Sequence, residues 1–334
     1  MQCRLLLLII FLLSLTGLWA QPPATEVNRT DAKGRKQGAW VKHWDNGMPR
    51  YEGQFIDDRP QGTFRYFDDK GKATSEVVHA GDGVVSRARH FHPDGSLLAT
   101  GKYLGQQKDS VWNYYGGNGK LRKVERYQAG QLDGDQVSYY ANGQVAERET
   151  RLKGQLHGPH SSWFESGKLK SESTYVNGEA EGTMVFYFPN GKKEIEGKVV
   201  NGNRDGVWFY FNDDGTIQLQ MLYASGVLKK ERKENGLFKE YYDDEQLMSE
   251  VTYKKGKREG AFKEYHDNGT WLIKPLPADP ISGAPADMER VLEGQTVKRT
   301  GTYVNDLLEG EVKEFDAKGK VVKVTRYLAG VEQP

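Results

Sequence analysis

Small residues recur at an interval of 24 along most of this chain. The series runs through Gly38, Gly62, Ser86, Ser110, Gly134, Gly158, Gly182 and Gly206, and it resumes at Gly236, Gly260 and Gly310 after two insertions. A fixed period of this length indicates a repeat architecture, in which no single unit is long enough to bury a core of its own. The 334 residues therefore do not divide into two or three independent globular domains.

Each unit has the residues of a β-hairpin when the small residue is counted as position zero. Position five is aromatic, as in Tyr115, Tyr139, Trp163, Tyr187, Phe211, Tyr241 and Tyr265. Position nine is glycine, usually after Asn or Asp, as in Gly119, Gly143, Gly167, Gly191, Gly215 and Gly269. Position seventeen is aromatic again, as in Tyr127, Tyr175, Tyr223 and Tyr253. Because Asn-Gly tolerates the positive φ of tight turns, this pattern predicts two strands joined by a turn.

Hairpins of this kind gain stability by stacking on their neighbours, since one alone is marginal in water. We therefore expect an all-β fold, an elongated twisted antiparallel sheet of tandem hairpins whose repeated rings form an aromatic ladder. The predicted array covers residues 38–330 in about eleven units, after an N-terminal linker and cap at 21–37 and before a tail at 331–334. The glycines and rings named above are structural residues of this repeat.

The first twenty residues differ from the rest. Arg4 precedes an apolar run, and the small residue Ala20 follows it, which is typical of a helical secretory signal peptide at residues 1–20. Cys3 is the single cysteine, so the mature chain has no thiol and no disulfide framework. We expect an exported protein of the periplasm, the cell surface or the extracellular space, with no integral membrane segment after cleavage.

A proline-rich insertion at 274–290 interrupts the array. Four prolines, Pro275, Pro277, Pro280 and Pro285, exclude a central strand, so the segment is either a loop that leaves the sheet or the remnant of a decayed unit. Loops on rigid scaffolds often carry binding residues, which makes this insertion a candidate contact site.

Few residues have the spacing of a chemical site. The 47 basic and 46 acidic residues balance, which gives no electrostatic reason to expect nucleic acid as a partner. His90, His92 and Asp94 make a metal site conceivable, yet a degenerate hairpin explains them better, and single histidines such as His43, His157 and His160 favour a structural role. We expect no catalytic, cofactor or metal residues, no required cofactor and no enzymatic activity.

The pattern of aromatic pair, Asn-Gly, Lys-Leu, Glu and Tyr, seen at Trp163 to Tyr175 with Ser-Gly in the turn, resembles the bacterial MORN repeat variant of the YwqK-family antitoxins. The resemblance covers about residues 38–330 and implies a scaffold that binds a protein partner, with an antitoxin-like role. Regularly spaced Tyr and Trp rings leave an alternative open, a cell-wall or carbohydrate-binding repeat protein in which the rings stack on a glycan. Burial of those rings would disfavour this alternative.

Overall fold

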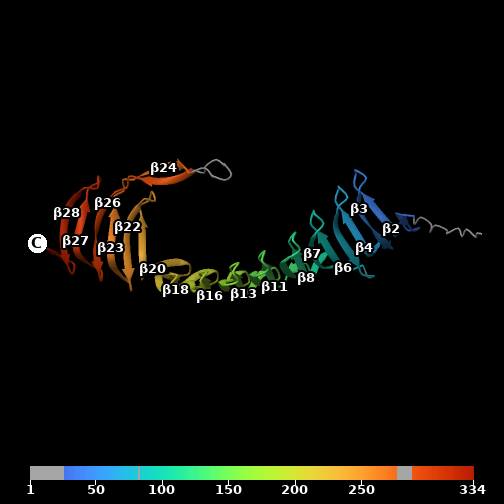
Figure 1. Cartoon of the computed structure of the whole chain (residues 1–334). Helices are drawn as coiled ribbons and strands as arrows, with labels where there is room; N and C mark the ends of the chain where they lie inside the picture. Colours follow the sequence, from blue (N-terminus) through green and yellow to red (C-terminus); the bar gives the residue numbers. More distant parts are fainter. Residues whose placement is uncertain (1–25, 82, 277–287) are drawn as a thin grey trace, which may run out of the picture. The chain divides into compact units, whose positions relative to one another are not determined.

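The computed structural model describes residues 26–81, 83–276 and 288–334 (Figure 1). The predicted signal peptide and its helix lie outside these residues. Within them, all regular secondary structure is β-strand, and the strands pair as successive antiparallel hairpins. The predicted all-β class of tandem hairpins is therefore confirmed. The chain separates into two compact units, one ending near Leu97 and the other comprising most of the residues after it.

The first unit contains one antiparallel sheet in which each strand pairs with the next in the chain. Its strands are β1 (Arg29–Thr30), β2 (Lys36–His43), β3 (Pro49–Ile56), β4 (Arg59–Phe67), β5 (Ala73–His79) and β6 (Val85–Phe91). The next strand, β7 (Leu97–Leu104), contributes residues to both units.

The second unit begins with a long run of paired strands. These are β8 (Gln107–Tyr115), β9 (Leu121–Gln128), β10 (Gln131–Leu132), β11 (Gly134–Tyr139), β12 (Val145–Leu152), β13 (Gln155–Trp163), β14 (Leu169–Val176), β15 (Glu179–Ala180), β16 (Gly182–Tyr187), β17 (Lys193–Val200), β18 (Asn203–Phe211), β19 (Ile217–Ala224) and β20 (Val227–Lys233). A second sheet follows, with β21 (Gly236–Tyr241), β22 (Leu247–Lys254), β23 (Lys257–Tyr265), β26 (Val297–Val304), β27 (Leu307–Phe315), β28 (Val321–Leu328) and β29 (Val331–Gln333).

The proline-rich insertion lies in the turn of the hairpin that begins at Gly260. Strand β23 pairs directly with β26, while β24 (Thr270–Pro275) and β25 (Met288–Glu293) pair only with each other and form a separate two-stranded sheet (Figure 1). Trp271 donates a hydrogen bond to the Asp244 carbonyl at 2.9 Å, and the Arg290 guanidinium lies 4.1 Å from the Trp271 ring. Of the two alternatives, the structure has the insertion that leaves the sheet; residues 277–287 lie outside the described residues.

Neighbouring hairpins are tied together at their turns. Gly143 closes its turn by donating to the Tyr140 carbonyl at 3.0 Å with φ 93°, a backbone conformation that favours glycine. Asn142 donates from Nδ2 to the Glu165 carbonyl of the next hairpin at 2.9 Å. The same bond joins Asn46 to Asp69 and Asn190 to Asp213, each pair 23 residues apart. The Asn-Gly pattern thus forms the turns and also links successive units.

The most buried large apolar side chains lie at position two of the repeat, three residues before the predicted aromatic position. These are Phe64, Trp112, Trp208, Phe262 and Val312, all at 2% exposure or less. The seven predicted rings at position five are half-buried, except Tyr241, which is 57% exposed. A β-bulge separates positions four and five in most hairpins, as between Tyr114 and Tyr115. The side chains at positions two and four lie on the same face of the sheet. The bulge ends this strand alternation before the predicted ring at position five.

Three of the buried rings at position two, Phe64, Trp112 and Trp208, pack against a glycine. A Cβ added at Gly53, Gly101 or Gly197 would lie 2.1–2.6 Å from the ring of Phe64, Trp112 or Trp208, respectively. These glycines occupy position fifteen, eleven residues before the ring that covers them. In these hairpins a ring at position two is stacked on a glycine at position fifteen. We call this arrangement the ring-and-glycine column, and the candidate site is where it changes.

Candidate functional site

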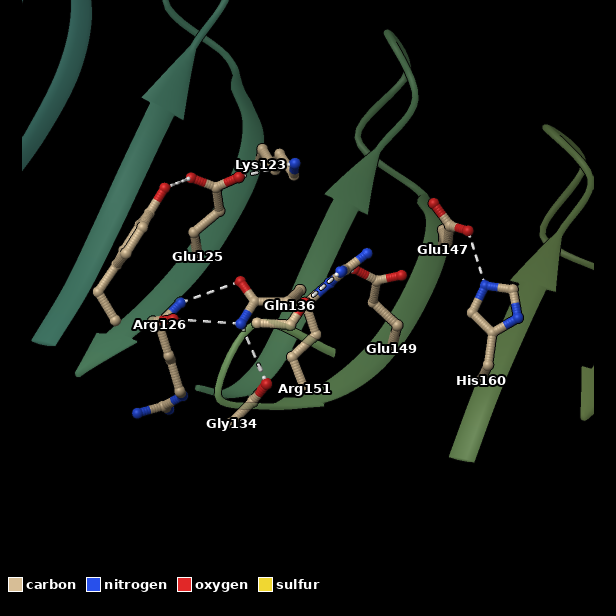
Figure 2. Close-up of polar contacts among 11 residues, drawn as sticks. Lys123, Glu125, Arg126, Gly134, Gln136, Glu147, Glu149, Arg151 and His160 are labelled. Atoms are coloured by element: carbon tan, nitrogen blue, oxygen red, sulfur yellow. Dashed lines mark hydrogen bonds and ion pairs between the residues drawn. The ribbon is translucent and has the colours of Figure 1, made fainter. Parts of the chain in front are cut away.

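The ring-and-glycine column becomes polar in three consecutive hairpins of the second unit, between β9 and β14 (Figure 2). At position two, Gln136 and His160 replace the aromatic ring. At position fifteen, Glu125, Glu149 and Ser173 replace the glycine. We call these five residues the polar column. They are candidates for function because they occupy the most buried positions of the repeat with groups that are costly to bury.

Strand register makes the polar column continuous. Gln136 pairs with Glu149 between β11 and β12, Glu149 pairs with His160 between β12 and β13, and His160 pairs with Ser173 between β13 and β14. Directly opposed residues on adjacent strands have close side chains on the same face. Glu147 lies two residues before Glu149 on β12, so it faces the same side.

Glu125 is buried, and three donors compensate for the loss of water. Lys123 Nζ lies 2.7 Å from Glu125 Oε1, and the Tyr127 hydroxyl donates to Oε2 at 2.6 Å. Burial alone would raise the pKa of Glu125, but hydrogen bonds from Lys123, Tyr127 and Tyr114, with the Lys123 charge, bring its pKa below the usual value. Burial and the same carboxylate raise the pKa of Tyr114. Glu125 is therefore a stable anion that binds its own neighbours.

Gln136 is 2% exposed, and its amide is fully engaged by backbone groups. Its Oε1 accepts a hydrogen bond from the Arg126 backbone N–H at 3.1 Å (Figure 2). Its Nε2 donates to the backbone carbonyls of Arg126 at 3.2 Å and Gly134 at 3.0 Å. This side chain replaces ladder hydrogen bonds where β9 and β11 separate, since these two strands share only two register pairs, at Val137 and Ser138 of β11.

Glu149 is paired with Arg151, two residues later on the same strand. Arg151 Nε lies 2.6 Å from Glu149 Oε1, and an Arg151 terminal nitrogen donates to the Gly154 carbonyl at 2.9 Å. Arg151 stands at position seventeen, where most other units have a tyrosine or phenylalanine. The replacement supplies a positive charge for the carboxylate at position fifteen.

His160 lies between a carboxylate and a hydroxyl. Its Nε2 is 2.7 Å from Glu147 Oε1 (Figure 2). Its Nδ1 is 3.4 Å from Ser173 Oγ. The His160 side chain is 18% exposed and that of Glu147 is 47% exposed, so the pair reaches solvent on the Glu147 side. One donor atom from each of Glu147, Glu149 and His160 lies within 4.8 Å of the others.

The polar column can hold charge and bind cations or hydrogen-bonding groups. Ser173, His160 and Glu147 are the residue types of a nucleophile, a base and an acid. The 3.4 Å contact between Ser173 Oγ and His160 Nδ1 is, however, longer than the about 2.6–3.2 Å expected of an activated nucleophile. The geometry therefore favours binding over nucleophilic chemistry.

The histidines that the sequence suggested for a metal lie elsewhere. His90 Nε2 is 3.3 Å from the Tyr103 hydroxyl. In the described part of the chain, His90, His92 and Asp94 do not converge on one point.

The sequence interpretation assigned His160 a structural role and did not single out Glu147 or Glu149. The signal that identifies them is a coordinated change across neighbouring hairpins. Glu at position fifteen is followed, eleven residues later, by Gln or His in place of the ring at position two: Glu125 precedes Gln136, and Glu149 precedes His160. The predicted turn glycines Gly119 to Gly215 have positive φ. Gly269 instead lies before the insertion and donates its N–H to Gln246 Oε1 at 2.6 Å.

A hollow of about 440 Å³ lies at the sheet that contains β21, β22, β23 and β26. Phe238, Tyr253 and Tyr303 line it together with Lys233 and Arg258. The ring faces are already occupied, because Lys233 Nζ lies 5.5 Å from the Phe238 ring centre and the Arg258 guanidinium 4.1 Å from the Tyr303 centre. This hollow therefore offers few free ring faces for a ligand.

Comparison with protein families gives two matches. A family model described as "MORN repeat variant" matches residues 234–255, and a model described as "Uncharacterised protein" matches residues 61–196. The first match supports a MORN-repeat protein, in agreement with the tandem hairpins. None of the curated proteins matches the chain. In the part of the chain that the structure describes, no helix is long and apolar enough to cross a membrane.

Solved structures show only weak likenesses. TarM is 13% identical over 29% of this chain and 19% of its own, with a TM-score of 0.23. The TcdB2-TccC3 structure is 11% identical over 84% of this chain and 17% of its own, with a TM-score of 0.18. A porin-like protein from Bacteroides uniformis is 8% identical over 76% and 94%, with a TM-score of 0.17. This chain thus spans less than a fifth of the first two structures, and nothing about its function follows from them.

Proposed function

We propose that this protein is an exported, non-catalytic repeat scaffold that binds a protein partner through the aromatic row at position five. The observation that carries the proposal is the partial exposure of that row. Tyr115, Tyr139, Trp163, Tyr187 and Phe211 are all half-buried and recur once per hairpin along continuously paired strands of the second unit. Export rests on the sequence of residues 1–20.

The spacing of this row fits a protein interface. Each hairpin advances the sheet by roughly 10 Å, so five successive rings extend over roughly 40 Å. Protein interfaces are enriched in Tyr, Trp and Phe, and a few such residues supply most of the binding energy. Charged residues on the same hairpins, such as Glu165 and Lys168 near Trp163, provide the polar rim of such an interface.

The alternative, a cell-wall or carbohydrate binder, draws on the same rings. The rings at positions two and seventeen do not favour it, because several are covered by cations of the chain itself. Arg204, for example, lies 4.4 Å from the Trp208 ring centre and 5.4 Å from that of Tyr223. The carbohydrate alternative would therefore draw on rings such as those of the half-buried position-five row. An antitoxin-like role would make the partner a toxin that acts outside the cytoplasm.

The test is affinity capture with residues 21–334 from envelope extracts of the exporting cell, followed by mass spectrometry. A variant with Tyr139→Ala, Trp163→Ala and Tyr187→Ala removes three neighbouring rings. A matched control, Val207→Ala with Leu222→Ala, removes two exposed apolar side chains of the same unit, 42% and 40% exposed. Thermal melting of both variants checks that the sheet is retained.

We expect the wild type and the control to capture the same protein. The ring variant should bind it at least about tenfold more weakly, which corresponds to a loss of about 1.4 kcal/mol of binding free energy. Capture of peptidoglycan or another glycan without protein would favour the alternative. Equal capture of the protein by the ring variant would contradict binding through position five.

A further inference from the structure

We propose that Glu147, Glu149 and His160 form a binding site for one divalent transition-metal ion, of which Zn²⁺ is the reference case. The site is independent of the proposed partner interface, because it lies at the polar column and not in the position-five row. Carboxylate oxygen and imidazole nitrogen are ligands that such ions take from proteins, and three protein ligands leave a position for water or a partner group.

The backbone places the three side chains without requiring a rearrangement. Glu147 and Glu149 are two residues apart on β12, and His160 is the register partner of Glu149 on β13 (Figure 2). Two ligands on one strand and a third on its neighbour converge above the sheet. Their donor atoms lie within 4.8 Å of one another. Tetrahedral zinc needs separations of about 3.3 Å, which small side-chain rotations provide.

Neighbouring side chains hold the proposed metal ligands in place through hydrogen bonds. Ser173 Oγ lies 3.4 Å from His160 Nδ1, so it could accept a hydrogen bond from Nδ1–H when Nε2 binds a metal ion. His160 Nε2 and Glu147 Oε1 are already 2.7 Å apart, so a metal ion bound by both atoms would take the place of the hydrogen between them. Arg151 holds one oxygen of Glu149 and thereby fixes the orientation of that carboxylate.

The local charges also point to a cation. Three carboxylates lie in or beside the polar column, and two of them have a permanently charged partner: Glu125 has Lys123, and Glu149 has Arg151. The third carboxylate, Glu147, has as its ion-pair partner His160, whose charge depends on protonation. A bound divalent ion would supply the charge that the third carboxylate lacks. The ion would reach the site from solvent on the side of Glu147, whose side chain is 47% exposed.

The experiment uses tag-free residues 21–334, titrated with Zn²⁺ in a calorimeter and with Co²⁺ by visible absorbance. The ligand variants are Glu147→Gln, Glu149→Gln and His160→Gln, which preserve approximate size and most hydrogen bonding. The matched controls are Glu172→Gln and His157→Gln, in the same two hairpins but outside the cluster. Circular dichroism and melting temperature without metal establish that each variant is folded, and Mg²⁺ serves as the hard-ion comparison.

We expect one Zn²⁺ per chain, Co²⁺ absorbance of a low-symmetry site, and at least about tenfold weaker binding in each ligand variant. The two controls should bind as the wild type does, and Mg²⁺ should not compete. Absence of saturable Zn²⁺ binding would overturn the proposal, as would folded ligand variants that bind Zn²⁺ as tightly as the wild type. Loss of partner capture has no bearing on this result, so the two proposals fail separately.

Discussion

Trp208 lies against the backbone of Gly197, so closely that a Cβ added to this glycine would be 2.2 Å from the indole ring. The indole Nε1 donates to the Lys198 carbonyl at 3.0 Å, and Trp208 is 1% exposed. The bulge of β17 at Gly197 lets the ring of one hairpin rest on the backbone of the preceding one. Contacts of this kind hold successive units together.

Gly197→Ala is therefore expected to lower the free energy of unfolding by about 1–3 kcal/mol, because the ring and the strand must separate to admit the methyl group. Urea denaturation followed by Trp fluorescence measures the change. Gly81→Ala is the matched control, since its Cβ meets nothing within 4 Å and its φ is not in the left-handed region. Equal stability of the two variants would refute the ring-on-glycine account of the core.

Gln136→Leu is expected to destabilise the protein although it makes a buried site apolar. The substitution keeps the approximate volume but leaves the Arg126 N–H and two backbone carbonyls without their side-chain partner. Each unsatisfied buried group costs about 1–3 kcal/mol, so we expect a loss of at least about 2 kcal/mol. Chemical denaturation measures it, and an unchanged or higher midpoint would show that the amide is dispensable.

Asn142→Ala is expected to loosen the contact between two neighbouring hairpins. It removes the Asn142 bond to the Glu165 carbonyl and the bond that Oδ1 accepts from the Gln144 N–H, both 2.9 Å long. The net cost is about 1–2 kcal/mol for the two bonds. Hydrogen exchange should accelerate in the turn around Glu165. Asn118→Ala is the comparison, because the bond that Asn118 Oδ1 accepts from the Lys120 N–H stays within its own turn; similar acceleration in the next turn of that variant would argue against an inter-hairpin role.

His79 makes the stability of the first unit depend on pH. Burial lowers the pKa of His79 from its usual 6.5. Its Nε2 is buried beside the Phe64 ring, whose centre is 5.1 Å from that of His79, and has no hydrogen-bond partner among the residues that the structure describes. The folded protein therefore binds the proton less tightly than the unfolded chain does. The stabilisation is complete above pH 6.5 and is lost as the pH falls through the lower folded value.

Melting temperatures between pH 5 and 8 test this expectation. The wild type should lose stability below about pH 6.5, and His79→Phe, which restores the aromatic residue usual at position seventeen, should reduce that loss. His43→Phe, at an exposed histidine of the same unit, controls for the change in composition. The same acid dependence in His79→Phe and the wild type would exclude His79 as its source.

The sequence correctly predicted the features that depend on the backbone preference of individual residues. Asn142 and Gly143 form the expected turn because positive φ is a local property. The sequence predicted a core of repeated rings at positions five and seventeen, whereas the most buried large apolar side chains lie at position two. Position two varies because each residue must fit the one eleven positions earlier: Trp208 requires Gly197, and His160 faces Glu149. The regularity with which a ring recurs along the chain therefore does not indicate how deeply that ring is buried.

The sequence by itself determined the period, the hairpins, the turns and the all-β class, because these follow from local backbone preferences repeated every 24 residues. Only the tertiary structure decided which side chains are buried, and that Glu147, Glu149 and His160 meet at one point. Strand register sets both outcomes, since it joins residues of different hairpins across hydrogen-bonded pairs, and a bulge in one strand changes which face a side chain occupies.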